Sequence, residues 1–369
     1  MRLPSLEDLP DVSGRHVLVR CDFNVPLRDG RIADDTRIRA ALPTLQWLVE
    51  RGASVTACSH LGRPKGRPDP GFAMTPVRER LLQLAPEVQL LDNLRFDPGE
   101  ESNDPAFVDR LVAGQELYVN EAFACAHRDH ASIVGPPARL PSAAGRLLVH
   151  EVDVLSGLLD NPRRPFVAVL GGAKVSDKLG VVEALLQKAD KVLVGGAMAF
   201  SFLAAAGNPT GDSLVDPTRV GRCRALLADP KLVLPIDLVV ARTDDPDSVE
   251  KVEQSVRDGW KGLDIGSGTS KAFAEIIGKA GTILWNGPVG QFEDDRFTSG
   301  TTAVASAVAS SPAFTVVGGG DTIAALARLG LSGQIDHVST GGGATLEFVE
   351  YGDLPGLQAL RDSAKLFAG

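Results

Sequence analysis

Apolar and polar positions along the chain form two kinds of segment. Short apolar runs such as His16–Arg20 and Leu117–Asn120 have the length of buried strands. Longer segments with helical spacing of their apolar residues, including Thr36–Glu50 and Thr75–Leu84, lie between them. Strands that alternate with helices predict parallel sheets with helices on both faces. The pattern therefore predicts an α/β protein.

The predicted strands fall into two groups, which indicates two doubly wound domains. A helical pattern over 147–160 separates the groups and ends at Asn161-Pro162, where a helix does not continue. A chain of 369 residues is also long enough for two domains. We expect domains at 1–150 and 166–350, a linker helix and hinge at 151–165, and a C-terminal segment at 351–369. The predicted strands are 16–20, 53–57, 88–91 and 117–120, then 166–170, 191–194, 282–285, 314–317 and 337–340.

Composition and charge narrow the class of protein. A net charge of −9 and a pI near 5.3 argue against a general nucleic-acid binder. The longest apolar runs, such as 231–240, are interrupted well before the length that a membrane span needs. The N-terminus has no secretion-signal pattern, and the four cysteines lack metal-type spacing. We expect a cytoplasmic protein with buried free thiols and neither a membrane nor a nucleic-acid partner.

Cationic and polar residues follow the predicted strands of the first half. The carboxyl ends of parallel strands meet at one sheet edge, where ligands bind. Several cations gathered there repel one another unless an anion compensates them, and arginine suits phosphate and carboxylate. We expect a small ligand that carries both groups. The alternative is that each arginine pairs with a nearby acid such as Asp34, Asp92 or Asp129. The gathered residues are Asp22, Asn24, Arg37, His60, Arg63, Arg95, His127 and Arg128.

Glycines follow the predicted strands of the second half, and several precede helical patterns. Such junctions expose backbone N–H groups that bind phosphate, although glycine also serves plain turns. Lys174 and Lys178 stand four residues apart after one junction, near an expected helix start. Asp321 and Thr322 follow another, which suits Mg²⁺ and a phosphoryl oxygen, with an N-cap role for Asp321 as the alternative. The junctions are Gly171-Gly172, Gly195-Gly196, Asn286-Gly287, 318–320 and 341–343.

Other nucleotide and metal motifs lack support. The chain contains neither the P-loop pattern GxxxxGK[ST] nor GxGxxG after a strand. His127 and His130 could suggest a metal pair, but two histidines alone make a poor zinc site.

Eight motifs resemble those of the phosphoglycerate kinase family, in the same order and over nearly the whole chain. They are Val19-Arg-Cys-Asp-Phe-Asn-Val-Pro-Leu27, Ser59-His-Leu-Gly-Arg-Pro-Lys-Gly66, Leu94-Arg-Phe96, Ala126-His-Arg128, Gly171-Gly-Ala-Lys174, Trp285-Asn-Gly-Pro-Val-Gly290, Gly318-Gly-Gly-Asp-Thr322 and Ser339-Thr-Gly-Gly-Gly-Ala344.

The resemblance implies two Rossmann-like three-layer domains, with the C-terminal segment returning to the first. It also implies reversible phosphoryl transfer between 3-phosphoglycerate and ATP in glycolysis, with Mg²⁺ as cofactor, in a monomer. Substrate and nucleotide would bind to separate domains and meet through hinge closure.

The resemblance assigns roles to individual residues. Arg37 and Lys174 would stabilise the transferred phosphoryl group, and Asp321 would hold Mg²⁺. The expected phosphoglycerate-binding residues are Asp22, Asn24, Arg37, His60, Leu61, Gly62, Arg63, Arg95 and Arg128. The expected nucleotide-binding residues are Lys178, Gly262, Asn286, Glu293 (on the ribose), Gly319, Gly320, Asp321 and Thr322. The phosphate-stabilising glycines would be Gly171, Gly172, Gly341, Gly342 and Gly343.

Some positions depart from the family pattern, and rival functions remain. The departures are Glu121, Ala124, Cys125, Asp129, Ser267 and Gln291. One rival is a kinase of this fold that acts on another phosphorylated carboxylic acid. Another is an inactive binding protein, although Arg37, Lys174 and Asp321 are all present. A nicotinamide-dependent dehydrogenase is a third, and the missing GxGxxG argues against it.

Overall fold

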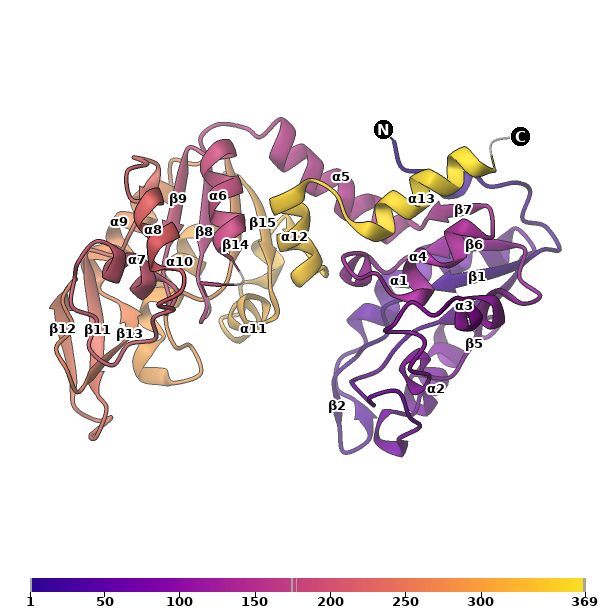
Figure 1. Cartoon of the computed structure of the whole chain (residues 1–369), viewed down its shortest axis with the longest axis horizontal. Coiled ribbons are helices and arrows are strands. Elements are labelled where there is room, and N and C mark those ends of the chain that lie inside the picture. Colours follow the sequence, from indigo (N-terminus) through magenta and orange to yellow (C-terminus); the bar gives the residue numbers. More distant parts are fainter. Residues whose placement is uncertain (1, 174, 177, 368–369) are drawn as a thin grey trace. The chain divides into compact units, whose positions relative to one another are not determined.

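The chain forms two compact units (Figure 1). The structure is a computed structural model that describes residues 2–173, 175–176 and 178–367. Unit 1 comprises the chain up to Val154 together with the C-terminal segment from Gly352, and unit 2 comprises Leu155–Tyr351. Helix α5 (Arg146–Asp160) begins in unit 1 and ends in unit 2.

Unit 1 is built on a five-stranded parallel sheet with the strand order β5-β4-β1-β6-β7. Its strands are β1 (His16–Arg20), β4 (Ser54–Cys58), β5 (Gln89–Leu90), β6 (Leu117–Asn120) and β7 (Ser142–Ala144), with a hairpin of β2 (Leu27–Arg28) and β3 (Arg31–Ile32). Its helices are α1 (Thr36–Glu50), α2 (Thr75–Leu84), α3 (Pro105–Val112), α4 (Ala131–Val134), the first part of α5, and α13 (Pro355–Leu366). Single 3₁₀ turns lie at Leu6–Asp8, Pro70–Phe72, Leu94–Phe96, Phe123–Cys125 and Pro136–Ala138.

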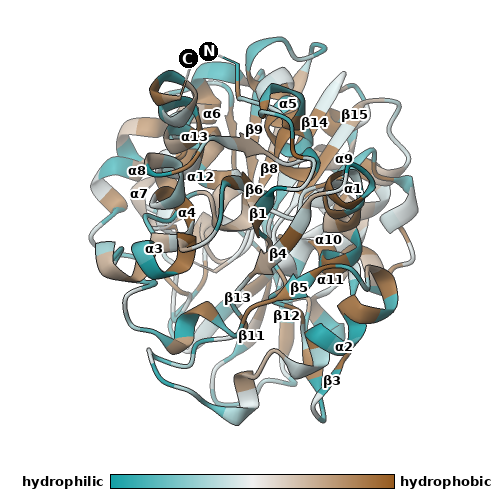
Figure 2. Ribbon diagram, turned by 90° about the vertical axis from the view of Figure 1, so that its right-hand side faces the viewer, coloured by the Kyte–Doolittle hydropathy of each residue, from teal (hydrophilic) through white to brown (hydrophobic). Residues whose placement is uncertain are grey.

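The alternation of side chains along β1 assigns its residues to two faces. Val17 and Val19 pack with α1 and α2 in one hydrophobic cluster, because successive strand residues point to opposite faces. Leu18 and Arg20 therefore face the other side, where Arg20 contacts Ser132 of α4. Figure 2 shows that helices such as α2 and α3 carry both hydrophobic and hydrophilic residues, as expected for helices that cover a sheet.

Unit 2 is built on a six-stranded parallel sheet with the order β10-β9-β8-β14-β15-β16. Its strands are β8 (Phe166–Leu170), β9 (Lys191–Val194), β10 (Leu232–Val233), β14 (Thr282–Asn286), β15 (Phe314–Gly318) and β16 (His337–Val338). Its helices are α6 (Leu179–Lys188), α7 (Ala199–Ala205), α8 (Val220–Leu226), α9 (Ser267–Ile277), α10 (Ser299–Ala309), α11 (Gly320–Arg328) and α12 (Gly343–Tyr351), with 3₁₀ turns at Asp295–Phe297 and Ser332–Gln334.

A second sheet in unit 2 was not anticipated from the sequence. Strands β11 (Asp237–Arg242), β12 (Val249–Glu253) and β13 (Trp260–Ile265) form an antiparallel sheet with β11 in the centre. The charged edge strand β12 is mostly exposed, so its residues give little of the apolar signal of a buried strand. The remainder confirms the predicted α/β class with two parallel sheets.

The C-terminal helix α13 packs within unit 1. The backbone N–H of Gly356 donates to the carbonyl of Ala126 (2.8 Å), and Ser363 Oγ donates to the carbonyl of Leu140 (3.0 Å). A Cβ on Gly356 would lie 2.8 Å from Ile133 Cγ2, so only glycine fits this contact. Among the described residues no helix combines the length and apolar character needed to cross a membrane.

A buried carboxyl group caps the start of α5. Glu121 follows β6, is 1% exposed, and its Oε1 accepts a hydrogen bond from the Leu147 N–H (3.2 Å). Beside it, Thr44 Oγ1 accepts one from the Arg146 N–H (2.8 Å). Burial raises the pKa of Glu121 to about 8, although hydrogen bonds from Thr44 and from backbone N–H groups favour the charged form. The carboxyl is therefore protonated in the folded state at neutral pH.

This raised pKa predicts a pH-dependent stability. Between its ordinary pKa of 4.5 and about 8, the folded state holds a proton that the unfolded state has lost, so stability falls as pH rises through that window. Glu121→Gln keeps a neutral group and removes this loss. Relative to the parent, its free energy of unfolding should rise by about 4 kcal/mol between pH 5 and pH 9. Urea titrations at both pH values measure the difference, and the exposed Glu50→Gln serves as the control. An equal pH dependence in all three proteins would contradict the assignment.

Candidate active site

The loops after β1 and β4 are joined by polar side chains in unit 1. Asn24 Oδ1 accepts a hydrogen bond from the Gly62 N–H (2.9 Å), and Asp22 Oδ1 accepts one from the Asn24 N–H (3.2 Å). Gly62 has a φ of +61°, and a Cβ there would lie 2.3 Å from the Phe72 ring. Glycine is thus required where the loop turns toward the sheet edge.

Asn93, which the sequence analysis did not single out, holds the same loops together. Its Oδ1 accepts hydrogen bonds from the backbone N–H groups of Leu61 (3.2 Å) and Arg95 (3.1 Å), and its Nδ2 donates to the carbonyls of Leu61 (2.7 Å) and Phe72 (2.9 Å). This buried amide fixes the backbone from which Arg95 projects. Its only sequence signal is its place directly before an Arg-containing turn at a strand end.

The structure brings Arg37, Arg95, Arg128 and His60 together at one edge of the sheet. The acids that pair with these arginines are not those named in the alternative interpretation. Arg37 pairs with Asp22. Arg95 Nη1 donates to the Gly62 carbonyl (2.8 Å), and its Nε lies 3.0 Å from Glu101 Oε1.

The three acids named as alternative partners have other contacts. Asp92 pairs with Arg78 (3.1 Å), Asp34 accepts from the Thr36 N–H (2.7 Å), and Asp129 accepts from Asn103 (3.2 Å). In the described part of the chain, Arg63 and Arg128 have no ion pair. Arg63 is exposed, and Nη1 of Arg128 is buried without a hydrogen-bond partner. The cationic set is thus only partly neutralised by the protein.

The electrostatics of this edge favour an anion. Burial, followed by the charges of nearby arginines, holds the pKa of His60 well below its usual range. Burial, then Arg128, lowers the pKa of both His127 and His130 to about 4. All three rings are therefore neutral at pH 7, and the charges of the nearby arginines add to the effect of burial.

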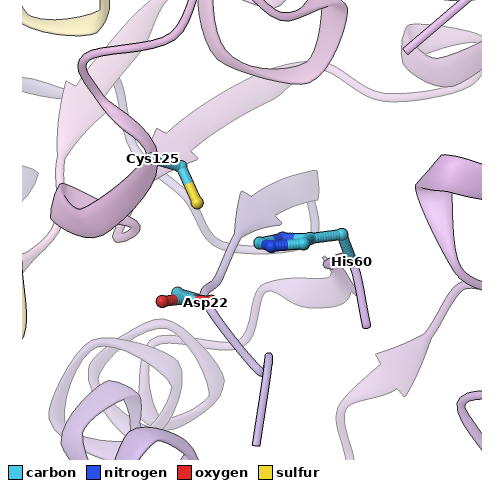
Figure 3. A group of neighbouring side chains, drawn as sticks. All are labelled: Asp22, His60 and Cys125. Atoms are coloured by element: carbon cyan, nitrogen blue, oxygen red, sulfur yellow. The ribbon is translucent and has the colours of Figure 1, made fainter. Parts of the chain in front are cut away.

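Asp22, His60 and Cys125 form a cluster at the centre of the site (Figure 3). Figure 3 shows their side chains pointing toward one another, and one ligand atom of each lies within 4.8 Å of the others. Burial raises the pKa of the Cys125 thiol, so it stays protonated. A metal cation would have to enter among arginines that the protein neutralises only in part and displace that proton, so we assign the cluster to the anion site. His127 and His130 do not belong to it.

Arg20 is a further residue of this site that the sequence analysis missed. Its side chain is 1% exposed and lies under His60, with Nη2 at 3.2 Å from His60 Nδ1. An arginine at the end of an otherwise apolar strand is a detectable signal, because a buried guanidinium needs several partners.

Two adjoining cavities mark the predicted nucleotide site in unit 2. One has a volume of about 240 Å³ and the other about 250 Å³, and Asp321 lines both. The first is lined by Gly172, Lys178, Asn286, Gly319, Gly320 and Thr322, among others. The second is lined by Phe200, Gly262, Leu263, Asp264, Gln291 and Glu293, among others. The sheet thus brings together every predicted nucleotide-binding residue.

The end of β14 supplies polar groups to the smaller cavity. Asn286 Oδ1 accepts a hydrogen bond from Lys178 Nζ (2.8 Å), and Lys178 Nζ also donates to the Gly171 carbonyl (2.7 Å). Asn286 Nδ2 is buried and has no hydrogen-bond partner among the described residues. Thr322 Oγ1 accepts from the Gly287 N–H (2.7 Å). A buried donor without a partner is costly unless a ligand satisfies it.

Glycines allow the strand-end loops to approach one another here. A Cβ on Gly287 would lie 2.3 Å from the Gly171 carbonyl oxygen, and one on Gly171 would lie 2.1 Å from that of Pro288. Gly319 has a φ of +92° and caps α11, so Asp321 lies in the first turn and is not an N-cap. Gly341, Gly342 and Gly343 lie at the start of α12 and line neither cavity.

Of the two lysines Lys174 and Lys178, the structure describes only Lys178. Lys178 is the N-cap residue of α6, which begins at Leu179, so it precedes the helix. Lys174 lies outside the described residues. The prediction that the two share a helical face is therefore not tested.

The residues around the cavities fit a magnesium nucleotide. The α11 N-terminus presents backbone N–H groups, Lys178 supplies positive charge, and the Asn286 Nδ2 donor is unsatisfied. The Asp321 carboxylate and Thr322 hydroxyl are oxygen groups of the kind that Mg²⁺ binds.

Comparisons with known proteins place the chain. The family model for phosphoglycerate kinase matches residues 6–89 and 84–351. The chain belongs to the phosphoglycerate kinase family. It is 52% identical to the phosphoglycerate kinase of Rubrobacter xylanophilus, over 96% of this chain and 97% of that protein, and 50% identical to that of Salinispora tropica, over 98% and 100%. The solved structure of phosphoglycerate kinase from Coxiella burnetii matches with a TM-score of 0.88 at 38% identity, covering 98% of this chain and 99% of that one.

The departures from the phosphoglycerate kinase pattern do not remove the charged groups of either site. Asp129 is held by Asn103, so it is not paired with the neighbouring Arg128. Cys125 and Glu121 are buried in unit 1, and Gln291 lines the larger cavity, with its N–H bonded to the Leu263 carbonyl (2.7 Å). Ser267 begins α9. Ala124 lies in the 3₁₀ turn Phe123–Cys125.

The wall of the larger cavity predicts a selective effect on nucleotide binding. A Cβ on Gly262 would lie 2.0 Å from Phe200 Cζ, and Phe200 is 3% exposed, so Gly262→Ala forces the ring to move. We expect the KM for ATP to rise about tenfold, which corresponds to about 1.4 kcal/mol, with the KM for 3-phosphoglycerate little changed. Steady-state kinetics measure both. Gly333→Ala, at an exposed glycine with open space, is the control. An equal rise in both constants would argue against the cavity as the nucleotide site.

Proposed function

We infer that the chain carries out the activity of its family, the reversible transfer of a phosphoryl group between ATP and 3-phosphoglycerate in glycolysis. The observation that carries this inference is the partly neutralised cationic edge of unit 1, which matches an acceptor with one phosphate and one carboxylate. The glycine-lined cavities of unit 2 supply the complementary nucleotide site.

We propose that the arginines of unit 1 hold the two anionic groups of 3-phosphoglycerate. Arg95 is buried and Arg128 is partly buried. Charge-assisted hydrogen bonds are strongest in such shielded positions. Arg63 is exposed and acts at the rim. Asp22 and Asn24 cannot pair with an anion through their oxygens, so their role is to bind the hydroxyl group. His60 is neutral and binds as a hydrogen-bond donor. Leu61 and Gly62 shape the loop.

We propose that different residues of unit 2 bind different parts of the nucleotide. Lys178, Asn286 and the start of α11 face the phosphates, because they supply the positive charge, the unpartnered donor and the helix N-terminus. Gly262 and Phe200 line the wall for the base, and Glu293 accepts from the ribose. Asp321 would hold Mg²⁺, which when bound neutralises phosphate charge.

The chemistry requires positioning and charge stabilisation more than proton transfer. The acceptor carboxylate of 3-phosphoglycerate is ionised at neutral pH, so no general base is needed. The phosphoryl group in flight carries dispersed negative charge, which Arg37 and Lys174 are proposed to stabilise. Donor and acceptor must also come into contact away from water, so we propose that the units close about the segment 147–165. A cytoplasmic monomer is part of this proposal on family resemblance alone.

Substitution of Arg37 tests the catalytic assignment. In a coupled assay of 1,3-bisphosphoglycerate formation, Arg37→Ala and Lys174→Ala should each lower kcat by about 100-fold, because each removes a stabilising charge. Arg39→Ala is the matched control, since Arg39 lies two residues further along α1 and pairs with Asp35. A parent enzyme without turnover that still binds MgATP in calorimetry would point to an altered acceptor site, near Glu121 and Asp129. Equal losses in Arg37→Ala and Arg39→Ala would contradict the specific role of Arg37.

The proposed magnesium ligand has its own test. Asp321→Asn should raise the Mg²⁺ concentration needed for half-maximal activity by about tenfold, because a charged oxygen ligand is replaced by a neutral one. Activity titrated with Mg²⁺ at constant ATP gives the value. Asp295→Asn, an exposed acid paired with Arg328, is the control. An unchanged Mg²⁺ requirement in Asp321→Asn would rule out this carboxylate as the ligand.

A further inference from the structure

Arg20 uses every nitrogen of its guanidinium within the protein. Its Nε donates to Ser132 Oγ (2.7 Å), its Nη1 donates to the Cys21 carbonyl, and its Nη2 contacts His60 Nδ1 (3.2 Å). The side chain is also 1% exposed. Arg20 is thus committed to internal contacts, unlike Arg63 and Arg128 of the same site.

A buried carboxylate completes this network from the side away from His60. Ser132 Oγ donates to Glu100 Oε1 (2.6 Å), and the Ser132 N–H donates to Oε2 (3.0 Å). Glu100 and Ser132 are both fully buried. The hydroxyl of Ser132 therefore accepts from Arg20 and donates to Glu100, so its single proton has a fixed direction. The negative charge of Glu100 offsets the positive charge of Arg20, which would otherwise be costly to bury.

The contact with Arg20 determines which nitrogen of His60 carries the proton. Arginine has only donor groups and stays protonated in proteins. His60 Nδ1 must therefore accept the hydrogen bond from Nη2, which leaves the proton of the neutral ring on Nε2. In free solution both tautomers of imidazole are populated, so the network selects one.

We propose that Glu100, Ser132 and Arg20 act as a positioning relay that fixes His60 in the Nε2–H tautomer, ready to donate to an anionic oxygen of the acceptor substrate. This inference rests on the proposed function, since it takes His60 as a substrate contact. The three relay residues do not touch the substrate and act through His60. None of them was among the binding residues expected from the sequence.

The surroundings of His60 favour the same neutral state. Its pKa is held well below the usual range by burial and then by arginine charges. The ring is thus neutral throughout the physiological range and keeps its donor. Charged and titratable groups surround His60 and the relay on several elements. They are Arg20 and Asp22 at the end of β1, Arg37 of α1, Cys58 of β4, Arg95 of the turn 94–96, Tyr118 of β6, Cys125 and Arg128 of the loop after β6, and Glu100 and His130 beyond Ser132.

Imidazole NMR of the ligand-free full-length enzyme tests the relay directly. Correlation of ring nitrogens with ring carbons in ¹⁵N-labelled protein, with His60 assigned through His60→Gln, identifies the protonated nitrogen. We expect Nε2 protonated and Nδ1 unprotonated in the parent. Ser132→Ala should introduce the second tautomer or a protonated ring, because the guanidinium loses the contact that orients it. A parent ring protonated on Nδ1 would overturn the relay without any use of a variant.

Kinetics connect the relay to the substrate. Ser132→Ala, and independently Glu100→Gln, should raise the KM for 3-phosphoglycerate by about tenfold and leave the KM for ATP unchanged. The rise should shrink as pH falls from 7.5 to 5.5, because a ring freed from Arg20 is more readily protonated and the imidazolium carries an Nε2–H donor whichever tautomer preceded it. Tyr118→Phe is the matched control, since it removes the hydroxyl that donates to the Ser132 carbonyl (2.7 Å) and leaves the relay side chains in place.

The two experiments separate the relay from the function on which it rests. If the parent has the expected tautomer and Ser132→Ala loses it, but the KM of this variant for 3-phosphoglycerate is unchanged, the role of His60 as a substrate contact would be overturned. Altered kinetics with an unaltered tautomer in Ser132→Ala would overturn the relay. An equal rise of both KM values, or an equal effect of Tyr118→Phe, would show a general structural loss and would also overturn it.

Discussion

Positive charges gathered at the carboxyl edge of the unit 1 sheet determine which neighbouring groups are needed to compensate them. Arg20, Arg37, Arg95 and Arg128 approach one neutral histidine, and the protein compensates some of them fully and others only in part. Arg20 is balanced deep in the core through Ser132 and Glu100. Arg128 keeps a buried nitrogen without a partner in the described part of the chain. The difference separates arginines that build the site from those available to a ligand.

In unit 2, too, some groups build the site and others are left available to a ligand, but here the close contacts are made mainly by the backbone. The glycine-rich ends of β8 and β14 approach so closely that a Cβ at Gly171 or Gly287 would overlap a neighbouring carbonyl oxygen. Asn286 connects them, with its Oδ1 bonded to Lys178 and its Nδ2 left open. In both units, parallel strands bring together residues that lie far apart in sequence. The sheet then holds them at the edge where ligands of such folds bind, with polar groups left for the proposed ligand to pair with.

Local patterns predicted much of this structure because the relevant signals are local. The helices Thr36–Glu50 and Thr75–Leu84 and the strand His16–Arg20 have the predicted bounds, since apolar spacing follows burial directly. The antiparallel sheet β11–β13 was missed because its edge strand is exposed and charged. Arg20 and Asn93 were missed for another reason. Their partners come from distant segments, such as Ser132 for Arg20, and pairing of that kind is visible only after folding.

The place of α13 has a consequence for how the protein is made. Gly356 contacts Ala126, which lies two residues before Arg128. Gly356 and Ala126 are 230 positions apart in the sequence. Unit 1 is therefore built from two segments of the chain, and the continuous unit 2 lies between them in the sequence. During synthesis from the N-terminus, the ribosome releases the whole of unit 2 before the last helix of unit 1 emerges. The loop that carries Arg128 therefore acquires its packing against α13 only after the whole of unit 2 has been made.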